Sequence, residues 1–433
     1  MGDLFRTSIE LILENQSPGG AYVASPSFPT YHYCWLRDGS FTAYAMDLAG
    51  EHESAERFFR WVDRVIRLHS HKIETVIRKI QDGQRLEQKD FLFTRYTLDG
   101  NEENESDWEN FQLDGYGTWL WALAAHVEMT GRAEILAELS ESIRETVRYI
   151  ENLWYYPNYD VWEENGDKVH TSTLACLYGG LSSIAEHLRD DCSGSTVAAP
   201  PGALAGALAG VQAGGPAGGP AGAPARVAAS APGIAPCREF PPGQASAPES
   251  APGIAPASEL PEALARALAK RIRAYILTNC VADGTFVKHV GSRDVDSSLL
   301  WLAVPFRVVD ARDETMRATV KRIERELLHD GGLHRYAKDT FYGGGEWILL
   351  TCWLGWYYAE SGDVAGARRL EKWVEQAADA AGHLPEQVCA HVNDQSFYPR
   401  WVEKWGEVAK PLLWSHAMYI VLESALRASA GDP

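Results

Sequence analysis

Two glutamates of this 433-residue chain stand in settings that suit acid–base chemistry. Glu163 follows Trp162 and precedes Glu164, while Glu386 follows a proline and precedes Gln387, just ahead of a predicted helix. An apolar wall and a like charge both raise the pKa of a carboxyl group, which suits Glu163 to donate a proton. The dipole at a helix N-terminus favours an anion, which suits Glu386 to act as a base. Hydrolysis of a glycosidic bond with inversion needs one carboxyl group of each kind, although each residue, taken alone, is more often a solvated surface glutamate.

Aromatic residues and Arg–Asp pairs recur around the two glutamates. An arginine fork donates hydrogen bonds, an aspartate accepts them, and an indole packs against the apolar face of a sugar ring. The same residue types also serve as helix caps, structural ion pairs and core, so the pattern alone leaves both interpretations open. The groups are Trp35 with Arg37 and Asp38, Trp108 with Asp114, and Arg335 with Asp339.

Motifs for other chemistries are weak or missing. Gly343, Gly344 and Gly345 precede a predicted helix but lack the GxGxxG pattern and the lysine of a phosphate-binding loop. None of the thirteen histidines forms an HExxH motif, and His69 with His71 is better explained as a helix face than as a ligand pair. We therefore expect no catalytic metal, nucleotide or flavin and no other cofactor, and the sequence leaves open whether a structural ion is bound.

Composition narrows the choice of partner and compartment. Asp and Glu number 59 against 40 Lys and Arg, a formal net charge of -19, which disfavours nucleic acids and anionic membranes as partners and favours a neutral substrate. The seven cysteines show no CxxC spacing, and the first predicted helix is amphipathic rather than a signal peptide. Because no apolar run is long enough to span a membrane, we expect a cytoplasmic protein.

Helical periodicity dominates the chain and predicts an all-α fold. Gly362 ends one predicted helix and Asp363 caps the next, and such short joints make antiparallel helical hairpins. Six hairpins, each with one inner and one outer helix, would close into an (α/α)6 toroid. The twelve predicted helices are 3–15, 39–49, 52–69, 114–129, 132–152, 171–189, 259–279, 294–303, 313–328, 346–361, 363–381 and 411–428, with a short thirteenth at 72–82 and a minor hairpin around Phe91, Phe93 and Tyr96 as additions.

The placement of the chemical motifs supports the toroid. If the even-numbered helices are the inner ones, the connections that lead into them all lie at one end of the barrel. The connections before helices two, four, six, ten and twelve hold Arg37, Trp108, Glu163, Arg335 and Glu386, and the one before helix eight holds the shorter charged run 293–296. We therefore expect long active-site loops at one end, with both glutamates among them.

Residues 193–258 break the helical pattern. They are dominated by Ala, Gly, Pro and Ser, contain almost no aromatic residues and carry SAPGIAP twice. Such a segment cannot bury enough apolar surface to offset its chain entropy, so we expect a disordered insertion. Because it falls in a joint between two helices, and the cost of loop closure grows slowly with length, residues 1–433 are predicted to form a single catalytic domain around it.

Five motifs in order give the chain a resemblance to glycoside hydrolase family 15, the glucoamylase family. They are YHYCWLRD at 31–38, WENFQLDG at 108–115, DVWEE at 160–164, HRYAKDTFYGGGEW at 334–347 and LPEQ at 384–387. The resemblance implies an exo-acting, inverting hydrolase that releases β-glucose without a cofactor, with Glu163 as general acid and Glu386 as general base. The substrate contacts that it implies fall on Tyr31, Trp35, Arg37, Asp38, Trp108, Glu164, Arg335 and Gln387.

Two departures from that family bear on the substrate. No starch-binding module follows the predicted barrel, and no β-sandwich precedes it, since the first predicted helix begins at residue 3. Small α-glucosides, with isomaltose-like α-1,6 linkages or short maltooligosaccharides ahead of starch, are therefore the expected substrates. A trehalase of the same family, an (α/α)6 disaccharide phosphorylase and a non-catalytic sugar-binding toroid are the alternatives. The sequence leaves the oligomeric state open.

Overall fold

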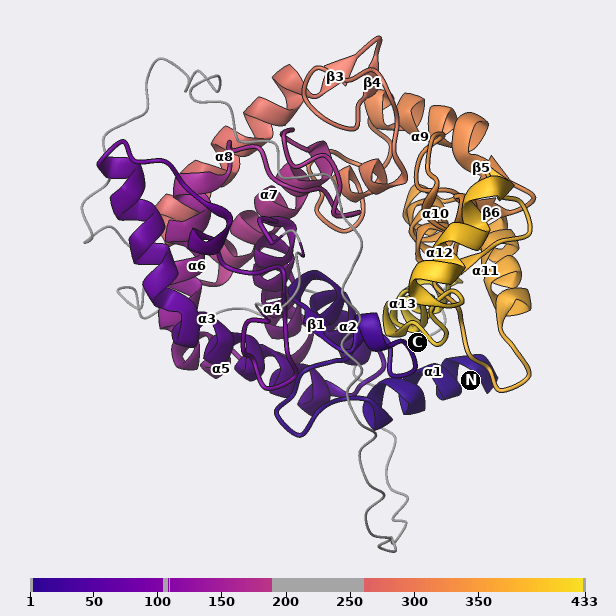
Figure 1. Cartoon of the computed structure of the whole chain (residues 1–433), viewed down its shortest axis with the longest axis horizontal. Helices are drawn as coiled ribbons and strands as arrows, with labels where there is room; N and C mark the ends of the chain where they lie inside the picture. The colour runs from indigo at the N-terminus through magenta and orange to yellow at the C-terminus, as the bar shows by residue number, and fades with distance from the viewer. Residues whose placement is uncertain (1–2, 104–107, 109, 189–260, 431–433) are drawn as a thin grey trace, which may run out of the picture. The chain divides into compact units, whose positions relative to one another are not determined.

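A computed structural model describes residues 3–103, 108, 110–188 and 261–430, which are mostly helical (Figure 1). The α-helices are α1 (Asp3–Glu14), α2 (Leu36–Leu48), α3 (His52–Gln81), α4 (Asp114–Thr130), α5 (Glu134–Glu138), α6 (Ser140–Leu153), α7 (Thr171–His187), α8 (Pro261–Asn279), α9 (Glu314–Leu327), α10 (Ile348–Ser361), α11 (Val364–Ala377), α12 (Tyr398–Trp405) and α13 (Leu413–Ala430). The 3-10 helices are η1 (Pro29–Tyr31), η2 (Gln88–Asp90), η3 (Ser297–Leu302), η4 (Phe341–Gly343) and η5 (Gln395–Phe397). No helix in these ranges is long and apolar enough to cross a membrane.

Six inner segments pack side by side in a closed ring. In order they are α2, α4, α7, η3, α10 and α13, and α13 returns to α2. Each inner segment is backed by an outer helix: α3 behind α2, α6 behind α4, α8 behind α7, α9 behind η3, α11 behind α10 and α1 behind α13. Figure 1 shows these outer helices around the inner ones. This arrangement confirms the predicted (α/α)6 fold, with one inner position taken by a 3-10 helix.

Burial separates the inner helices from the outer ones. The inner helix α10 buries eleven of its fourteen residues, so nearly every side chain around it meets protein. The outer helix α9 buries only five of fourteen, at Met316, Thr319, Val320, Ile323 and Leu327. That spacing of three and four residues places the buried side chains in one stripe, and the charged remainder faces outward.

Two inner helices approach each other at glycines. A Cβ atom added to Gly180 of α7 would lie 2.1 Å from the carbonyl oxygen of Gly117 in α4. A Cβ atom on Gly117 would in turn lie 2.5 Å from the carbonyl oxygen of Cys176. Only residues without a Cβ permit this backbone contact, so the two glycines set how closely α4 and α7 pack.

Aromatic side chains from four inner segments form one core. The ring of Phe41 in α2 lies 5.5 Å from that of Trp301 in η3 and 5.7 Å from that of Trp414 in α13, measured between centroids. Trp301 lies 4.8 Å from Trp353 of α10. These contacts join segments that are far apart in the sequence.

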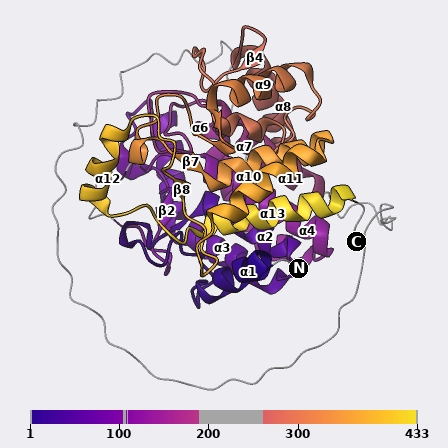
Figure 2. The same ribbon diagram turned by 90° about the vertical axis from the view of Figure 1, so that its right-hand side faces the viewer.

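The connections into the inner segments carry the short strands and α12. The strands are β1 (Cys34–Trp35), β2 (Arg95–Tyr96), β3 (Val281–Ala282), β4 (Thr285–Phe286), β5 (Leu328–His329), β6 (Gly332–Leu333), β7 (Glu346–Trp347) and β8 (Gln387–Val388). All pairs are antiparallel: β1 with β2, β3 with β4, and a four-stranded sheet in the order β5-β6-β7-β8. Figure 2 shows β2, β7, β8 and α12 together at one end of the helices.

Several predicted elements differ in the structure. Residues 294–303, predicted as a helix, form only η3, since Pro305 follows within a turn and cannot donate to an extended helix. The segments 52–69 and 72–82 are a single helix, α3, because the buried face continues through His69, Lys72 and Ile73. The segment 132–152 is divided into α5 and α6 at Leu139.

The aromatic hairpin and α12 are the other differences. The predicted hairpin around Phe91 and Phe93 does not form, because β2 pairs with β1 instead of folding back on its own neighbours. Residues 398–405 form α12, which the helical pattern did not predict. The segment 193–258 lies outside the described residues.

Candidate active site

A tight turn presents Glu163. The carboxylate of Asp160 accepts hydrogen bonds from the amides of Trp162, at 3.0 Å, and Glu164, at 2.9 Å. The amide of Glu163 donates to the carbonyl of Asp160 at 2.9 Å. These bonds hold Glu163 at φ +64°, a left-handed conformation that is uncommon outside glycine. The turn thus fixes the backbone from which the Glu163 carboxyl group projects.

The Glu163 carboxyl group lies in a buried setting. It accepts a hydrogen bond of 2.5 Å from the indole nitrogen of Trp35. Burial raises the pKa of Glu163, and the charge of Arg37 and the bond from Trp35 act in the opposite direction. The raised pKa agrees with the prediction of a proton donor, and burial is its main cause.

Glu386 is buried, and only one of its two carboxyl oxygens accepts a hydrogen bond within the part of the chain that the structure describes. One carboxyl oxygen, Oε1, accepts a hydrogen bond of 3.0 Å from the Tyr31 hydroxyl, and Oε2 has no hydrogen-bond partner among the described residues. Burial raises the pKa of Glu386 to about 8, and the Tyr31 bond lowers it. The helix-dipole argument for an anion at this position was wrong, because the chain continues from Glu386 into β8 and not into a helix.

Tyr31 and Trp35 join the two glutamates into one site. Tyr31 is bonded to Glu386, Trp35 is bonded to Glu163, and the two aromatic rings lie 5.7 Å apart between centroids in an edge-to-face contact. The structure therefore brings together two carboxyl groups that are more than two hundred residues apart in the sequence.

Arg37 is held by three oxygen-bearing side chains. Its guanidinium donates to Asp38 at 3.1 Å, to Gln112 at 3.2 Å and to Asp114 at 3.0 Å. Asp114 is 1% exposed, and its second oxygen accepts from the amide of Gly115, so it is placed to fix Arg37. Burial raises the pKa of Asp38 to about 7, which Arg37 opposes.

Arg335 and Glu164 form the second cluster of the site. Arg335 is buried and its guanidinium forms a two-pronged pair with Asp339, which includes an Nε to Oδ2 bond of 2.7 Å. Its Nη2 also reaches Glu164 at 3.4 Å, and the Tyr336 hydroxyl donates to the same carboxylate. Glu164 thus turns to Arg335 while the adjacent Glu163 turns to Trp35, which separates the two neighbouring carboxyl groups.

Gln387 is positioned by the backbone. Its amide oxygen accepts a hydrogen bond of 2.9 Å from the amide of Gly345, while its Nε2 is buried and has no partner among the described residues. The same holds for Nε1 of Trp108. Buried donors of this kind normally find a partner, so these two groups are available to bind a ligand rich in hydroxyl groups.

Trp108 belongs to an aromatic group that the sequence indicated only in part. The guanidinium of Arg95 lies 3.9 Å from the Trp108 ring and 4.2 Å from the Tyr33 ring. Trp405 of α12 stacks on Trp108 with centroids 6.2 Å apart. Sequence reasoning missed Arg95 because it stands in a short strand without a neighbouring acidic residue to mark it, and it missed the role of Trp405 because α12 was not predicted.

A buried charged group behind the turn was also missed. Lys288 lies 3.4 Å from the carboxylate of Asp160 and 3.1 Å from that of Asp296. Asp296 in turn accepts hydrogen bonds of 2.9 and 3.1 Å from the indole nitrogen of Trp162. This network anchors both the turn and the tryptophan beside Glu163. The charged run 293–296 was a signal for Asp296, but Lys288 had none.

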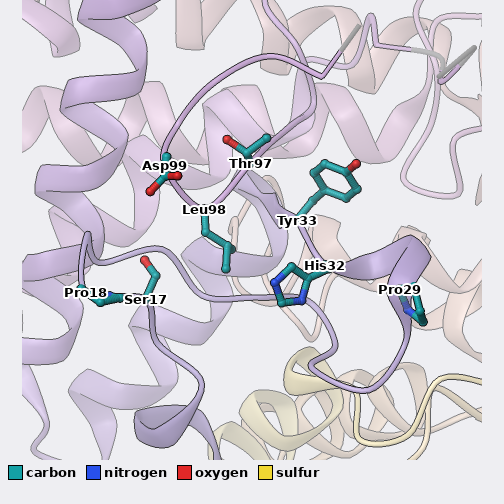
Figure 3. Close-up of a pocket in the computed structure, with 8 residues that line it drawn as sticks. All are labelled: Ser17, Pro18, Pro29, His32, Tyr33, Thr97, Leu98 and Asp99. Carbon is teal, nitrogen blue, oxygen red and sulfur yellow. The ribbon is translucent and has the colours of Figure 1, made fainter. Parts of the chain in front are cut away.

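A pocket of about 500 Å3 flanks this site without containing it (Figure 3). Tyr33, the same ring that covers Arg95, forms part of its wall. The other lining residues are Ser17, Pro18, Pro29, His32, Thr97, Leu98 and Asp99. None of the predicted site residues lines this pocket, so the chemistry of the glutamates does not take place in it.

Nearly the whole of the described barrel matches one protein family. The family model for glycosyl hydrolases family 15 matches residues 3–423. The chain belongs to glycosyl hydrolase family 15. The resemblance drawn from the five motifs is confirmed, and the protein is a glycoside hydrolase.

The relatives of this family 15 chain differ in sequence identity and in how much of their length the chain matches. The isomaltose glucohydrolase of Kribbella flavida is 36% identical over 425 residues, which cover 98% of this chain and 92% of the relative. A trehalase of Thermoplasma volcanium is 23% identical over 406 residues, 88% of this chain and 52% of that relative. A solved wild-type glycosidase is 36% identical and superposes with a TM-score of 0.78, covering 98% of this chain and 96% of its own. Glutamate-to-alanine variants of a glycosidase have also been solved, one of them in complex with glucose.

Proposed function

We propose that this family 15 protein is an inverting, exo-acting α-glucosidase. It removes the non-reducing terminal glucose from small α-glucosides, either isomaltose-type α-1,6 linkages or short maltooligosaccharides, and releases β-glucose without a cofactor. The observation that carries the proposal is the joining of Glu163 and Glu386 into one buried site through Trp35 and Tyr31.

The two carboxyl groups have complementary tasks in the proposed reaction. Glu163, with its raised pKa, holds a proton and gives it to the glycosidic oxygen as the bond to the sugar breaks. Glu386 in its ionised form takes a proton from a water molecule that attacks the anomeric carbon from the other face. Because burial raises the pKa of Glu386 to about 8, its ionised form is a stronger base than an exposed glutamate. The unpaired oxygen Oε2 is available to accept from that water.

The neighbouring groups fit a glucosyl ring. Arg37, Asp38, Glu164 and Arg335 provide charged donors and acceptors, and the side-chain nitrogen of Gln387 adds an uncharged donor for a sugar hydroxyl. Trp108 and Trp405 provide aromatic faces beyond the glutamates. No metal or nucleotide is needed for any step.

The comparisons support the assignment of the glutamates and of the substrate class. In the solved glycosidase, alanine replaces glutamate at one position in one variant and at a second position in another. The number of residues between these two positions equals the number between Glu163 and Glu386 in this chain when residues 193–258 are not counted. The relative that is 36% identical and matched over 92% of its length is named isomaltose glucohydrolase. This similarity favours substrates with an α-1,6 linkage.

Two alternatives are less well supported. The trehalase relative is less similar and is matched over only about half of its length. A phosphorylase needs a spare cation beside the base, whereas Arg335, which lies near Glu386, is already paired with Asp339 and Glu164.

A substrate panel followed by proton NMR tests the proposal. The purified protein is incubated with maltose, isomaltose, panose, trehalose and dextran, and the anomeric signals are recorded within minutes. We expect β-glucose to appear first and isomaltose to be hydrolysed faster than maltose or trehalose. Initial release of α-glucose, or of glucose 1-phosphate only when phosphate is present, would refute the inverting hydrolase.

We also propose a cytoplasmic location. Cys34, Cys176, Cys280 and Cys352 are buried and unpaired, and Cys389 is half-buried and unpaired, which suits a reducing compartment. Fractionation of the native cells, with the protein followed by an antibody, would test this.

A further inference from the structure

Two histidines and an aspartate converge at the end of the barrel remote from the glutamates. Asp47 stands near the C-terminal end of α2, His52 is the first residue of α3, and His126 lies in the last turns of α4. The site residue Arg37 stands near the other end of α2, ten residues earlier, which corresponds to about 15 Å along a helix. The cluster is therefore separate from the catalytic centre.

The three side chains meet around one carboxylate. Nδ1 of His126 lies 2.9 and 3.0 Å from the two oxygens of Asp47, and Nδ1 of His52 lies 2.9 Å from Oδ1 of the same residue. One ligand atom from each residue lies within 4.8 Å of the others. Asp47 and His126 are buried and His52 is partly exposed. Two imidazole nitrogens and a carboxylate oxygen at this spacing are a donor set that suits Zn2+ and similar divalent metals.

The second nitrogen of His126 provides an independent indication. Nε2 is fully buried, has no hydrogen-bond partner among the described residues, and lies 3.7 Å from a carboxylate oxygen of Glu56. Arg60 and Arg132 hold that carboxylate in place. If neutral His126 donated from Nδ1 to Asp47, the lone pair of Nε2 would face the Glu56 carboxylate. A metal ion on Nδ1 removes this conflict, because the proton then resides on Nε2 and points to Glu56.

We propose that Asp47, His52 and His126 bind a divalent first-row metal ion such as Zn2+. Glu56 lies behind His126 on the side that the carboxylate takes in the carboxylate–histidine–metal pattern of many zinc sites. Water completes the coordination. Since the ligands come from α2, α3 and α4, the ion links the turn between α2 and α3 to the C-terminal end of α4. It stabilises the barrel without taking part in catalysis. The sequence left a structural ion open, because these ligands lie on three different helices and form no local motif.

Zinc binding by the full chain tests the proposal. The protein is stripped with a chelator, dialysed against Zn2+, and analysed for bound metal and for melting temperature. We expect one Zn2+ per chain and a melting temperature several degrees higher than that of the stripped protein. Replacement of Zn2+ by Co2+ should give the visible absorption bands of a cobalt ion bound by nitrogen and oxygen ligands.

Variants separate this site from adventitious binding. His52→Ala removes a partly exposed ligand, and Asp47→Asn keeps the shape of the buried Asp47 side chain but removes its charge. If one variant fails to fold, the other still tests the site. Each should weaken Zn2+ binding by at least about tenfold, whereas His71→Ala, an exposed histidine of α3, should bind as wild type does. Equal binding by all variants, no bound metal, or a stability that depends on pH but not on Zn2+ would overturn the proposal.

Discussion

Glu163 combines an unusual backbone with a buried side chain. A non-glycine residue in the left-handed region costs about 1–3 kcal/mol, and the turn of Asp160 holds Glu163 there. The same turn directs Glu164 to Arg335, so two adjacent glutamates occupy different surroundings. The turn therefore positions the Glu163 carboxyl group at a cost in backbone strain, and it does not serve to stabilise the fold.

Replacing either glutamate by glutamine should abolish most of the activity. Glu163→Gln removes the proposed proton donor and Glu386→Gln the proposed base, and each change should lower kcat by at least about a hundredfold to a thousandfold, or roughly 3–4 kcal/mol in transition-state stabilisation. Initial rates on the best substrate of the panel measure the effect. Glu134→Gln, at an exposed position of α5, is the matched control and should leave the rate unchanged. Turnover near that of wild type in either active-site variant would show that its glutamate has another role.

Glu386→Gln should also stabilise the fold, and more at pH 8 than at pH 5. Burial raises the pKa of Glu386 from its ordinary 4.5 to about 8, so the native state retains a proton that the unfolded chain releases in this range. The stability of the wild type therefore falls as pH rises from about 4.5 to about 8. Glutamine carries no charge and avoids that loss. Urea unfolding at both pH values, with Glu134→Gln as reference, measures the difference, and an equal gain at both would contradict the assigned cause.

At the scale of elements, the contact between α4 and α7 depends on glycine. Gly180→Ala would place a Cβ 2.1 Å from the carbonyl oxygen of Gly117, and since that neighbour is backbone, the two helices must separate. We expect a destabilisation of about 1–3 kcal/mol in urea unfolding. Gly19→Ala is the control, since its Cβ would meet only ordinary contacts at 3.6 Å or more and should change stability little. Equal stability of the two variants would mean that α4 and α7 adjust without cost.

The elements also show what the sequence could and could not predict. The outer helices were found because their buried residues repeat every three or four positions, and the inner helices because they are long and apolar. Short elements fixed by tertiary contacts were predicted less well: the helix predicted at 294–303 is only the shorter η3, and neither α12, which places Trp405 on Trp108, nor β8, which follows Glu386, was predicted. Likewise Arg37 and Arg335 were found beside an aspartate, whereas Lys288 and Arg95 acquire their partners only by folding.

At the scale of the molecule, closure of the ring is what creates the site. Glu163, Arg335 and Glu386 stand in three different connections, each of which precedes a different inner segment, and Arg37 stands in the first turn of the inner helix α2. In a single hairpin these residues would have no common neighbour. When α13 packs against α2, the last inner segment meets the first, and the bond between Tyr31 and Glu386 spans that junction. The site therefore forms only when the two ends of the described chain have come together.

Removal of residues 193–258 should leave this assembly intact. The helices on either side, α7 and α8, pack against each other, and residues before and after the segment belong to one compact unit, so we propose that the segment is an insertion into a single catalytic domain. Replacing it by a short Gly/Ser linker should change the melting temperature by only a few degrees and kcat/KM by less than about twofold, because the entropy of loop closure varies slowly with length.

A second variant, in which a Gly/Ser segment of equal length replaces 193–258, distinguishes length from sequence. If both variants match the wild type, the segment contributes neither to folding nor to catalysis. If only the short linker impairs folding, the joint between α7 and α8 needs length alone. If both variants lose activity by more than about tenfold while a folded barrel persists, the Ala/Gly/Pro-rich sequence itself acts on the site, and the proposal of a passive insertion is wrong.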